Sequence, residues 1–364
     1  INTSHNYDTY TPTKIMDSVQ SVSLGNDYSA AITTDGSLYT WGCNNHGQLG
    51  DGTTTDSSIP IKVMDNVKSV SLSCSGPYDY QTAAITTDGS LYMWGYNKNG
   101  QLGDGTTTDS SVPVKIMENV QSVSLSWLCS AAITTDGSLY IWGYADFYHN
   151  GMASLTPIKI LEDVQSVCAD GAAITTDGSL YTWGCGYLGD GKYTDNTKPV
   201  LTPIKIMVNV QTVEFGTSCR AALTTDGSLY TWGINWEASL GNGTTKDSPT
   251  PIKIMDNVQS ICLCENNSAA VTTDGDLYIW GSYAYLAGTG NGITVYNRTP
   301  KKILENVYSV DLQSRSGVAL TTDGNLYEWG SGSAGPAGKG YNNELPSKVT
   351  IPAKSSTQFA ATQL

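Results

Sequence analysis

Residues 33–42 read Thr-Thr-Asp-Gly-Ser-Leu-Tyr-Thr-Trp-Gly, and close copies of this phrase recur along the chain. The seven copies lie at residues 33–42, 86–95, 134–143, 175–184, 224–233, 272–281 and 321–330. Their aspartates are spaced 53, 48, 41, 49, 48 and 49 residues apart. A near-constant period in this range is the sequence signature of a repeat architecture. The chain is therefore predicted to contain seven copies of one supersecondary unit.

Each unit is predicted to contain four strands. Asp35-Gly36 separates two short apolar runs, and this pair supplies the positive φ angles of a two-residue type I′ hairpin turn. Upstream, residues 19–24 alternate apolar and small polar side chains, as a half-buried strand does. Downstream, residues 60–63 open with proline, which is tolerated only at strand starts and on edge strands. Lys62 suits such an edge, because lysine there discourages aggregation, so this fourth strand is predicted on the outer rim.

Four antiparallel strands repeated seven times predict an all-β fold, a seven-bladed β-propeller. A solenoid would pair strands between repeats, whereas the tight hairpins pair them within each repeat. We expect one closed ring over residues 1–350 and a C-terminal tail over residues 351–364. The tryptophans of the phrase are predicted to pack between blades: Trp41, Trp94, Trp142, Trp183, Trp232, Trp280 and Trp329.

The loop after the hairpin carries a family resemblance. Residues 45–56, Asn-His-Gly-Gln-Leu-Gly-Asp-Gly-Thr-Thr-Thr-Asp, and the Pro-x-Lys run that follows resemble the regulator-of-chromosome-condensation repeat. So does the run Ala-Ala-Ile-Thr-Thr-Asp-Gly-Ser-Leu-Tyr-x-Trp-Gly, and the match covers roughly residues 12–350. The resemblance implies a bacterial-type seven-bladed propeller that can grip a partner with one face. The chain departs from the family where a histidine usually precedes the Ala-Ala-Ile strand, because that position holds Tyr28, Cys129, Cys219 or Asn267.

Composition restricts the classes of partner. The formal net charge is −14 and the pI is about 4.5. An acidic chain without a basic stripe is a poor candidate for nucleic acid or an anionic membrane, so the family's chromatin role does not transfer. No apolar run is long enough to span a bilayer, which argues against membrane insertion. Few lysines and many Thr, Ser, Asn and Tyr residues favour an extracellular or cell-surface location, and the start at Ile1 indicates a processed product or a fragment.

The eight cysteines form no Cys-x-x-Cys pair. Cys168 and Cys262 take the inner-strand position that holds serine in other repeats, which favours small buried side chains. Most of the others lie in expected loops, where a disulfide would suit an exported protein. Eight cysteines allow many pairings, so no disulfide is assigned.

The loops divide between the two faces of the predicted ring. Hairpin turns and blade-to-blade turns open on one face and vary little. Loops from the first strand to the second, and from the third to the fourth, open on the other face and are varied and aromatic. Tyr and Trp give rigid contact area with a polar group, so this loop face is the predicted binding surface; alternatively, its aromatics only pack beneath their own loops. The candidate residues are Tyr78, Tyr80, Tyr96, Trp127, Tyr144, Tyr148, Tyr187, Trp236, Tyr283 and Tyr285.

Within residues 1–350, the Pro-x-Lys run occurs eight times for seven hairpins. Assembly-strand candidates are Pro12, Lys14 and Ile15 in the first copy and Pro346, Lys348 and Val349 in the last. Either the N-terminal copy pairs into the last blade, or the C-terminal copy completes that blade and residues 1–16 are surplus. The surplus copy is available for strand addition to another molecule, or it packs along the rim.

No catalytic constellation is visible. His5, His46 and His149 lack ligand-like spacing, so no metal site is predicted. There is no Gly-x-Ser-x-Gly elbow or phosphate-cradling loop. Residues 50–56 lack the ligand spacing of an EF-hand, which favours a turn over a calcium site. We therefore expect no enzyme activity and no cofactor.

The predicted function is that of a non-catalytic exported module that recognises a protein or glycan through the loop face. The alternative is a structural subunit that assembles with other copies of itself into a cell-surface filament or array through the surplus strand.

Overall fold

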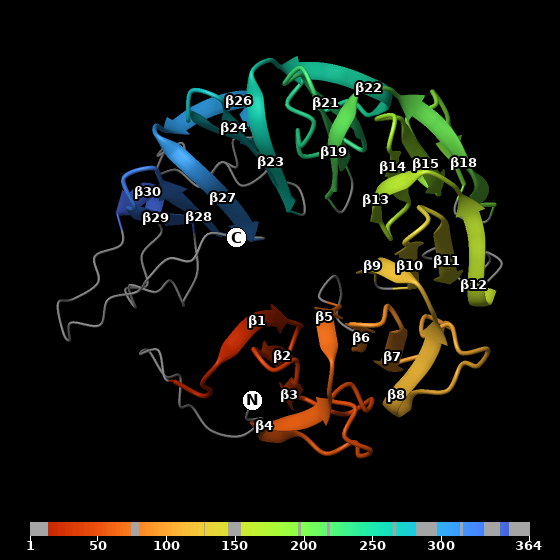
Figure 1. Ribbon diagram of the computed structural model, residues 1–364. Coiled ribbons are helices and arrows are strands. Elements are labelled where there is room, and N and C mark those ends of the chain that lie inside the picture. Colours follow the sequence, from red (N-terminus) through yellow and green to blue (C-terminus); the bar gives the residue numbers. More distant parts are fainter. Residues whose placement is uncertain are drawn as a thin grey trace.

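The computed structural model describes residues 14–73, 80–126, 128–144, 154–195, 198–216, 219–264, 267–281, 297–313, 316–330 and 343–348. Seven four-stranded antiparallel sheets follow one another around a common centre (Figure 1). The all-β, seven-bladed prediction is confirmed. Over the described ranges, the structure has no helix of the length and apolarity that a membrane crossing needs.

The sheets are numbered one to seven along the chain, and the strands of each sheet lie side by side in chain order. Sheet one contains β1 (Val19–Leu24), β2 (Tyr28–Thr33), β3 (Leu38–Gly42) and β4 (Ser57–Met64). Sheet two contains β5 (Val67–Leu72), β6 (Gln81–Thr86), β7 (Leu91–Gly95) and β8 (Ser110–Met117). Sheet three contains β9 (Val120–Leu125), β10 (Cys129–Thr134), β11 (Leu139–Gly143) and β12 (Ser154–Leu161). Sheet four contains β13 (Val164–Cys168), β14 (Ala172–Thr175), β15 (Leu180–Gly184) and β18 (Val200–Met207).

The last three sheets repeat the arrangement. Sheet five contains β19 (Val210–Phe215), β20 (Cys219–Thr224), β21 (Leu229–Gly233) and β22 (Ser248–Met255). Sheet six contains β23 (Val258–Cys264), β24 (Asn267–Thr272), β25 (Leu277–Gly281) and β26 (Asn297–Leu304). Sheet seven contains β27 (Val307–Gln313), β28 (Ser316–Thr321), β29 (Leu326–Gly330) and β30 (Asn343–Lys348). A small extra pair, β16 (Gly186–Tyr187) and β17 (Tyr193–Thr194), lies in the loop between β15 and β18.

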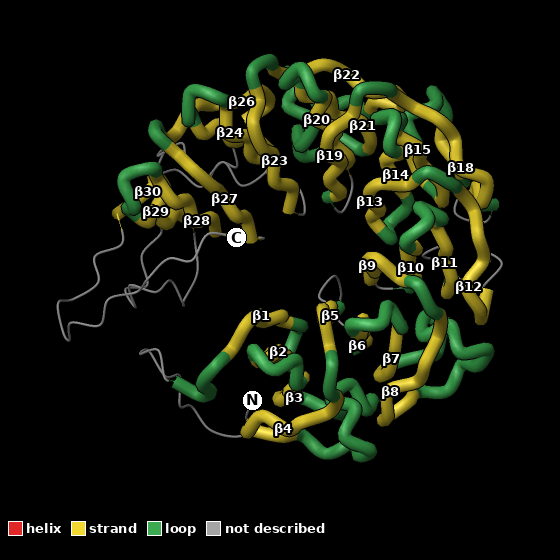
Figure 2. Tube along the Cα trace, in the orientation of Figure 1, coloured by secondary structure: helices red, strands yellow, loops and turns green. Residues whose placement is uncertain are grey.

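Within each sheet, the first strand lies nearest the centre and the fourth lies on the rim (Figure 2). The Pro-x-Lys strands therefore occupy the outer position predicted for them. In sheets one, two, three, five and six, the lysine pairs with an acidic residue of the turn that follows, as Lys62 Nζ does with Asp65 Oδ1 at 2.6 Å.

The Asp-Gly hairpins form where predicted, but their turn type was predicted wrongly. A type I′ turn needs positive φ at both central residues, whereas Gly36 has φ +82° and Asp35 is absent from the positive-φ residues of the described chain. Thr33 closes the loop twice, because its carbonyl accepts from Gly36 N–H (2.8 Å) and its N–H donates to Ser37 O (2.9 Å). The Asp35 carboxylate also accepts from Thr33 Oγ1 (2.5 Å) and Ser37 N–H (3.1 Å). These bonds stabilise a three-residue loop with only its glycine in the left-handed region.

The core lies between neighbouring sheets as six apolar clusters. In the first, Ile32 and Leu38 of sheet one pack with Val67, Leu72 and Trp94 of sheet two. The predicted packing of the phrase tryptophans between blades is borne out where these clusters form, and the six tryptophans after the first are buried. The tryptophan of sheet one, Trp41, is only partly buried.

Sheets one and seven stand at the two ends of the arc (Figure 1). Over the described residues, none of the six apolar clusters joins sheet one to sheet seven, and the closed ring stays a prediction. Val22 and Leu24 of β1 are 66% and 69% exposed, and Leu320 of β28 is 36% exposed.

The terminal Pro-x-Lys copies differ in their placement. β30 pairs antiparallel with β29, so the C-terminal copy completes sheet seven. Lys14 and Ile15 belong to no strand, and Ile15 is 60% exposed. Pro12 and Val349 lie outside the described residues. Of the two arrangements left open by the sequence, this structure contains the one in which the N-terminal copy is surplus.

Candidate binding face

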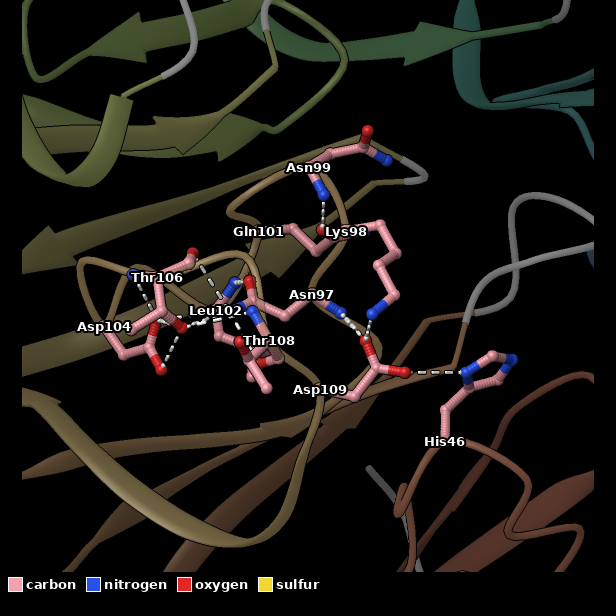
Figure 3. Close-up of polar contacts among 10 residues, drawn as sticks. All are labelled: His46, Asn97, Lys98, Asn99, Gln101, Leu102, Asp104, Thr106, Thr108 and Asp109. Atoms are coloured by element: carbon pink, nitrogen blue, oxygen red, sulfur yellow. Dashed lines mark hydrogen bonds and ion pairs between the residues drawn. The ribbon is translucent and has the colours of Figure 1, made fainter.

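In sheets one, two and five, the loop from the third to the fourth strand is organised by one buried asparagine. In sheet two this is Asn97, which follows β7 and is fully buried. Its Nδ2 donates to Asp104 Oδ1 (3.1 Å) and to the carbonyl oxygens of Thr106 (3.2 Å) and Thr108 (3.1 Å). Its Oδ1 accepts from Leu102 N–H at 2.9 Å (Figure 3). The amide thus uses its donors and its acceptor within the loop, which makes the loop an ordered platform.

The same arrangement recurs in sheets one and five, around Asn44 and Asn235. In sheet one, the Asp51 carboxylate accepts from Thr53 N–H (2.9 Å) and from Asn44 Nδ2 (3.2 Å). Its oxygens therefore stabilise the loop itself, which supports the interpretation of residues 50–56 as a turn. Within the described ranges, no cluster of three or more His, Cys, Asp or Glu side chains could hold a metal ion.

In sheet two, the aspartate before the outer strand connects neighbouring loops. Asp109 Oδ1 accepts from the backbone N–H of Asn97 (3.0 Å), and its Oδ2 lies 2.9 Å from Nδ1 of His46 in the loop of sheet one. Lys98 Nζ lies 3.7 Å from the same carboxylate. Figure 3 shows His46 reaching across to Asp109 from the neighbouring sheet.

Aromatic side chains surround this contact. The His46 ring stacks on Tyr80, with centroids 5.3 Å apart and planes inclined by 23°. Tyr96 meets the same imidazole edge-on at 4.9 Å, and Tyr28 lies 6.5 Å beyond Tyr80. We call His46, Tyr80, Tyr96 and Asp109 the first seat.

A second seat of the same construction joins sheets four and five. Asp247 Oδ1 accepts from the backbone N–H of Asn235 (2.9 Å), and its Oδ2 accepts from the Tyr187 hydroxyl (3.2 Å). Tyr193 packs edge-on against Tyr187 with centroids 5.1 Å apart. Burial and the bond to Asp247 raise the pKa of Tyr187, so its hydroxyl remains a donor at neutral pH. We call Tyr187, Tyr193, Trp236 and Asp247 the second seat.

A cation lies beneath the second seat. Arg220 Nη1 donates to the Tyr187 carbonyl and Nη2 donates to the Cys185 carbonyl (3.2 Å). The guanidinium also lies 5.0 Å from the centroid of the Phe215 ring, at cation–π distance. Burial lowers the pKa of Arg220 to about 10, so the group stays charged at neutral pH and holds the β16–β17 loop.

The two seats differ in exposure. His46 and Asp109 keep 27% and 25% of their side-chain surface exposed, whereas Tyr193 and Trp236 are 56% and 75% exposed. Trp236 directly follows the loop asparagine of sheet five, on the platform that Asp247 caps. The second seat therefore offers the larger accessible aromatic surface.

The structure places the ten predicted binding residues in different positions. Tyr80 and Tyr96 come together in the first seat, and Tyr187 and Trp236 belong to the second. Tyr144 follows β11 separately, partly buried, and its N–H donates to Leu128 O at 2.8 Å. The other five lie outside the described residues: Tyr78, Trp127, Tyr148, Tyr283 and Tyr285.

Sequence reasoning missed the polar members of both seats, His46, Asp109 and Asp247, and the two cations that contact the seats, Lys98 and Arg220. A signal for the aspartates was present, because one follows the loop asparagine by 12 positions in sheets one, two and five. No comparable spacing identified His46, because its partner belongs to the next repeat.

Three cysteines of the described chain lack the lowered pKa of an activated nucleophile. Burial raises the pKa of Cys168 to about 12 and that of Cys219 and Cys262 to about 11. These thiols are protonated at neutral pH, and a protonated thiol is a poor nucleophile and metal ligand. Cys168 and Cys262 are half-buried, less enclosed than predicted, and they are free thiols, as are Cys43 and Cys219.

Family models match nearly the whole chain. The RCC1-like domain model matches residues 79–363. Models of the regulator of chromosome condensation (RCC1) repeat match residues 35–78 and 19–48.

Curated relatives match shorter segments. The E3 ubiquitin-protein ligase HERC2 of Homo sapiens is 35% identical over 105 residues, which cover 29% of this chain and 2% of that protein. The ultraviolet-B receptor UVR8 of Arabidopsis thaliana is 32% identical over 113 residues, which cover 30% of this chain and 26% of that protein. The chain thus aligns with only a small part of these relatives.

Solved structures match over more of the chain. A structure of Kap60 bound to yeast RCC1 (Prp20) matches with a TM-score of 0.61 and 20% identity, covering 97% of this chain and 92% of that one. Human WBSCR16 matches with a TM-score of 0.58 and 20% identity, covering 93% and 83%. Prp20p of Saccharomyces cerevisiae matches with a TM-score of 0.60 and 20% identity, covering 92% and 77%. Together with the domain model, which covers more than half of the sequence, these likenesses show that the chain belongs to the RCC1-like domain family.

Proposed function

We propose that the chain is a non-catalytic binding module that takes a protein partner on its loop face. RCC1-like propellers are generally protein-binding modules, and the similar Prp20p is described by its binding to Gsp1p and histones. Those particular partners are not carried over, because the shared 20% identity supports the fold and not the surface. Of the two partner classes considered from the sequence, protein is therefore preferred to glycan.

The observation that carries the proposal is the exposure of Trp236, at 75%, on an ordered platform. An exposed indole on a loop whose backbone is already bonded can bury a large apolar area with little loss of conformational entropy. Tyr193, at 56% exposure, adds a second ring through its contact with Tyr187. Tryptophan and tyrosine are the residues most often found to dominate binding energy at protein interfaces.

The experiment compares capture of partners from the natural source by three forms of the chain. The first is the unaltered chain, and the second carries Trp236→Ala with Tyr193→Ala. The third carries Tyr308→Ala, a matched control at the second residue of β27, next to a blade-to-blade turn, where the tyrosine is 63% exposed. The proposal expects a partner that the unaltered chain and the control retain and the double variant loses.

If all three forms retain the partner, the interface does not include the second seat. Loss by the control as well would show a general effect of removing surface aromatics. Far-ultraviolet circular dichroism and a melting curve on each form check that the sheets are intact.

The extracellular or cell-surface location expected from composition stays a prediction, which fractionation of the source cells tests. Assembly into a filament or array stays the second candidate. The observation in its favour is the surplus N-terminal Pro-x-Lys copy, because β30 already occupies sheet seven. Electron microscopy of concentrated protein tests it, and a strictly monomeric sample argues against it.

A further inference from the structure

The first part of the loop from β15 to β18 is shorter than in sheets one, two and five, and it lacks their organising asparagine. In sheet five, six residues lie between the end of β21 and Leu240, and the second of them is the buried Asn235. In sheet four, three residues lie between the end of β15 and Leu188, and none of them is asparagine. The two leucines are equivalent, because the carbonyl of each accepts from a threonine of its own third strand at 2.8 Å. The loop of sheet four must therefore be held by other bonds.

Sheet five supplies bonds in place of that asparagine. Arg220 of β20 donates from Nη1 to the Tyr187 carbonyl and from Nη2 to the Cys185 carbonyl (3.2 Å). Asp247, which precedes β22, accepts from the Tyr187 hydroxyl (3.2 Å). The β16–β17 hairpin is thus held from the neighbouring sheet at both the backbone and the ring of Tyr187.

Arg220 occupies a position at which five other sheets carry a small residue. It faces Trp232 across the pair of strands β20 and β21. The residues that face the equivalent tryptophans of sheets one, two, three, six and seven are Ser29, Thr82, Ser130, Ser268 and Gly317. In this set of six positions, Arg220 alone carries a charge, so the boundary between sheets four and five is built differently from the others in the set.

At three other boundaries, the small residue and the tryptophan share one acceptor in the preceding loop. Ser130 Oγ and Trp142 Nε1 both donate to Gln101 O, at 2.9 and 2.8 Å. The same two bonds end on Gln48 O at the boundary of sheets one and two, and on Ser239 O at the boundary of sheets five and six. A bond from the indole to the preceding loop is therefore the usual arrangement in this fold.

Tyr187 takes the place of these acceptors, because it directly precedes Leu188 as they precede the equivalent leucines. Its carbonyl accepts from Arg220, and Trp232 Nε1 has no partner among the described residues although Trp232 is fully buried. At Gly189 an added Cβ would lie 3.2 Å from Trp232 Nε1, so the indole still lies against the loop. The acceptor, and not the position of the indole, is what differs at this boundary.

The chemistry of the two donors explains which of them holds the carbonyl. A hydrogen bond from a charged donor is stronger than one from a neutral donor. The guanidinium also presents its donors in a rigid fork, which here reaches the carbonyls of Cys185 and Tyr187 together. The indole of Trp232 offers a single neutral N–H. The exchange leaves one buried donor unbonded and fixes two carbonyls of the loop.

We propose that Arg220 is the positioning residue of the second seat, and that it acts by taking the Tyr187 carbonyl from Trp232. The guanidinium holds the loop backbone so that the Tyr187 hydroxyl reaches Asp247 and the Tyr193 ring packs against Tyr187. When the guanidinium is removed, the carbonyl returns to Trp232, as at three other boundaries, and Tyr187 leaves Asp247. The effect of Arg220 on partner binding rests on the proposed function, whereas its effect on the loop does not.

Arg220→Ser tests the exchange, because serine faces the tryptophan in sheets one, three and six. Nuclear magnetic resonance follows the indole N–H of Trp232, identified by its absence in Trp232→Phe, and the titration of the Tyr187 hydroxyl carbon. In Arg220→Ser, the Trp232 signal should move downfield and its exchange with solvent should slow, because it gains a bond. The Tyr187 titration should move to lower pH, because burial and the Asp247 contact, which raise the pKa of Tyr187, are both reduced. Ser130→Ala, the same position in sheet three, is the control and should move neither signal.

The unaltered chain provides a test that does not depend on the folding of Arg220→Ser. Its Trp232 indole N–H should resonate upfield of the bonded indoles of Trp94, Trp142 and Trp280 and should exchange faster than they do. A Trp232 N–H as far downfield and as well protected as those three overturns the proposal. A folded Arg220→Ser chain in which neither the Trp232 nor the Tyr187 signal moves overturns it as well.

Capture of partners from the natural source separates this proposal from the proposed function. Arg220→Ser keeps Trp236 and Tyr193, yet it should lose the partner that the unaltered chain retains. If the double variant Trp236→Ala with Tyr193→Ala loses the partner and Arg220→Ser keeps it, Arg220 does not position the seat for binding. If the Trp232 and Tyr187 signals move but the double variant still retains the partner, the proposed function is wrong and the positioning of the loop by Arg220 stands.

Discussion

His46 Nδ1 lies 2.9 Å from Asp109 Oδ2, so a loop of sheet one is bonded to the residue that introduces the outer strand of sheet two. The other oxygen of Asp109 caps the buried loop of its own sheet through Asn97 N–H. One carboxylate therefore stabilises both a loop and a boundary between sheets. The Tyr187–Asp247 contact has the same construction three sheets further on.

Asp109→Ala is predicted to destabilise the chain more than His46→Ala. The aspartate variant loses the acceptor of a buried backbone N–H as well as the contact to histidine, at a cost of about 1–3 kcal/mol. The histidine variant loses only the contact between sheets, at a cost of about 0.5–1.5 kcal/mol. Urea unfolding at neutral pH measures both, with Asp109→Asn as a control that keeps an acceptor. Equal losses in the two alanine variants would contradict the double role of Asp109.

Two buried tryptophans form a matched pair for a single hydrogen bond. Trp142 Nε1 donates to Gln101 O at 2.8 Å, whereas Trp232 Nε1 has no hydrogen-bond partner among the described residues. Trp→Phe removes the same indole area at both sites, but it breaks a bond only at Trp142. Trp142→Phe is therefore predicted to lower the free energy of unfolding by about 1–2 kcal/mol more than Trp232→Phe. Chemical unfolding followed by circular dichroism measures the difference, and losses of the same size would show that the indole bond contributes nothing.

The hairpin aspartates predict an acid-sensitive element. Thr175 Oγ1 donates to Asp177 Oδ1 at 2.6 Å, and this bond, with further bonds from Ser179, lowers the pKa of Asp177 to about 2. Because the folded-state pKa lies below the unfolded value, the contribution is present above about pH 4 and is lost as the pH falls towards 2. Thr175→Val is predicted to raise the pKa of Asp177 and to weaken the fall in melting temperature below pH 4.

Titration of the Asp177 carboxyl carbon by nuclear magnetic resonance measures the shift directly. Thr224→Val, in the equivalent hairpin of sheet five, is the control, because Thr224 donates to Asp226 and not to Asp177. An unchanged Asp177 titration in Thr175→Val would show that the threonine bond does not depress this pKa.

What could be predicted from the sequence was local and repeated. The Asp35-Gly36 pair between apolar runs indicated a hairpin, and a proline at the head of the fourth run indicated an outer strand. The hairpin prediction rests on the backbone conformation that Asp-Gly favours, and the outer-strand prediction rests on the backbone N–H that proline lacks. Both properties belong to the residues themselves. The predicted turn type was wrong because the Asp35 side chain accepts hydrogen bonds from Thr33 and Ser37. These bonds stabilise a different loop, and the preference of the Asp-Gly dipeptide for a type I′ turn does not take them into account.

Contacts between repeats could not be predicted in the same way. His46 and Asp109 are 63 positions apart, and their meeting depends on how one sheet is rotated against the next. The exposed ends of the arc were also missed, because a count of eight outer strands does not say which one a sheet edge accepts. The exposure of Leu320 and Leu326, 36% and 40%, becomes visible only in three dimensions.

Asn97→Asp is predicted to be strongly destabilising, although it changes one atom type. The Nδ2 group that donates to Asp104 Oδ1, Thr106 O and Thr108 O would be replaced by an oxygen that faces three acceptors. Repulsion and the loss of buried donors should cost about 3–5 kcal/mol at neutral pH. Asn99→Asp is the matched control, because that side chain is partly exposed, and it should change stability by no more than about 0.5 kcal/mol.

The Asn97→Asp loss should shrink as the pH is lowered. Burial and the nearby Asp104 carboxylate would raise the pKa of the introduced acid, and its protonated form regains one donor for the loop. Folding then favours proton uptake. The loss in free energy of unfolding relative to the unaltered chain is therefore largest at pH values above the raised pKa, and it becomes smaller at pH values below that pKa. Urea midpoints of the two variants and the unaltered chain at neutral and mildly acidic pH measure this. A deficit that is independent of pH, or equal in Asn97→Asp and Asn99→Asp, would show that the buried amide does not organise the loop.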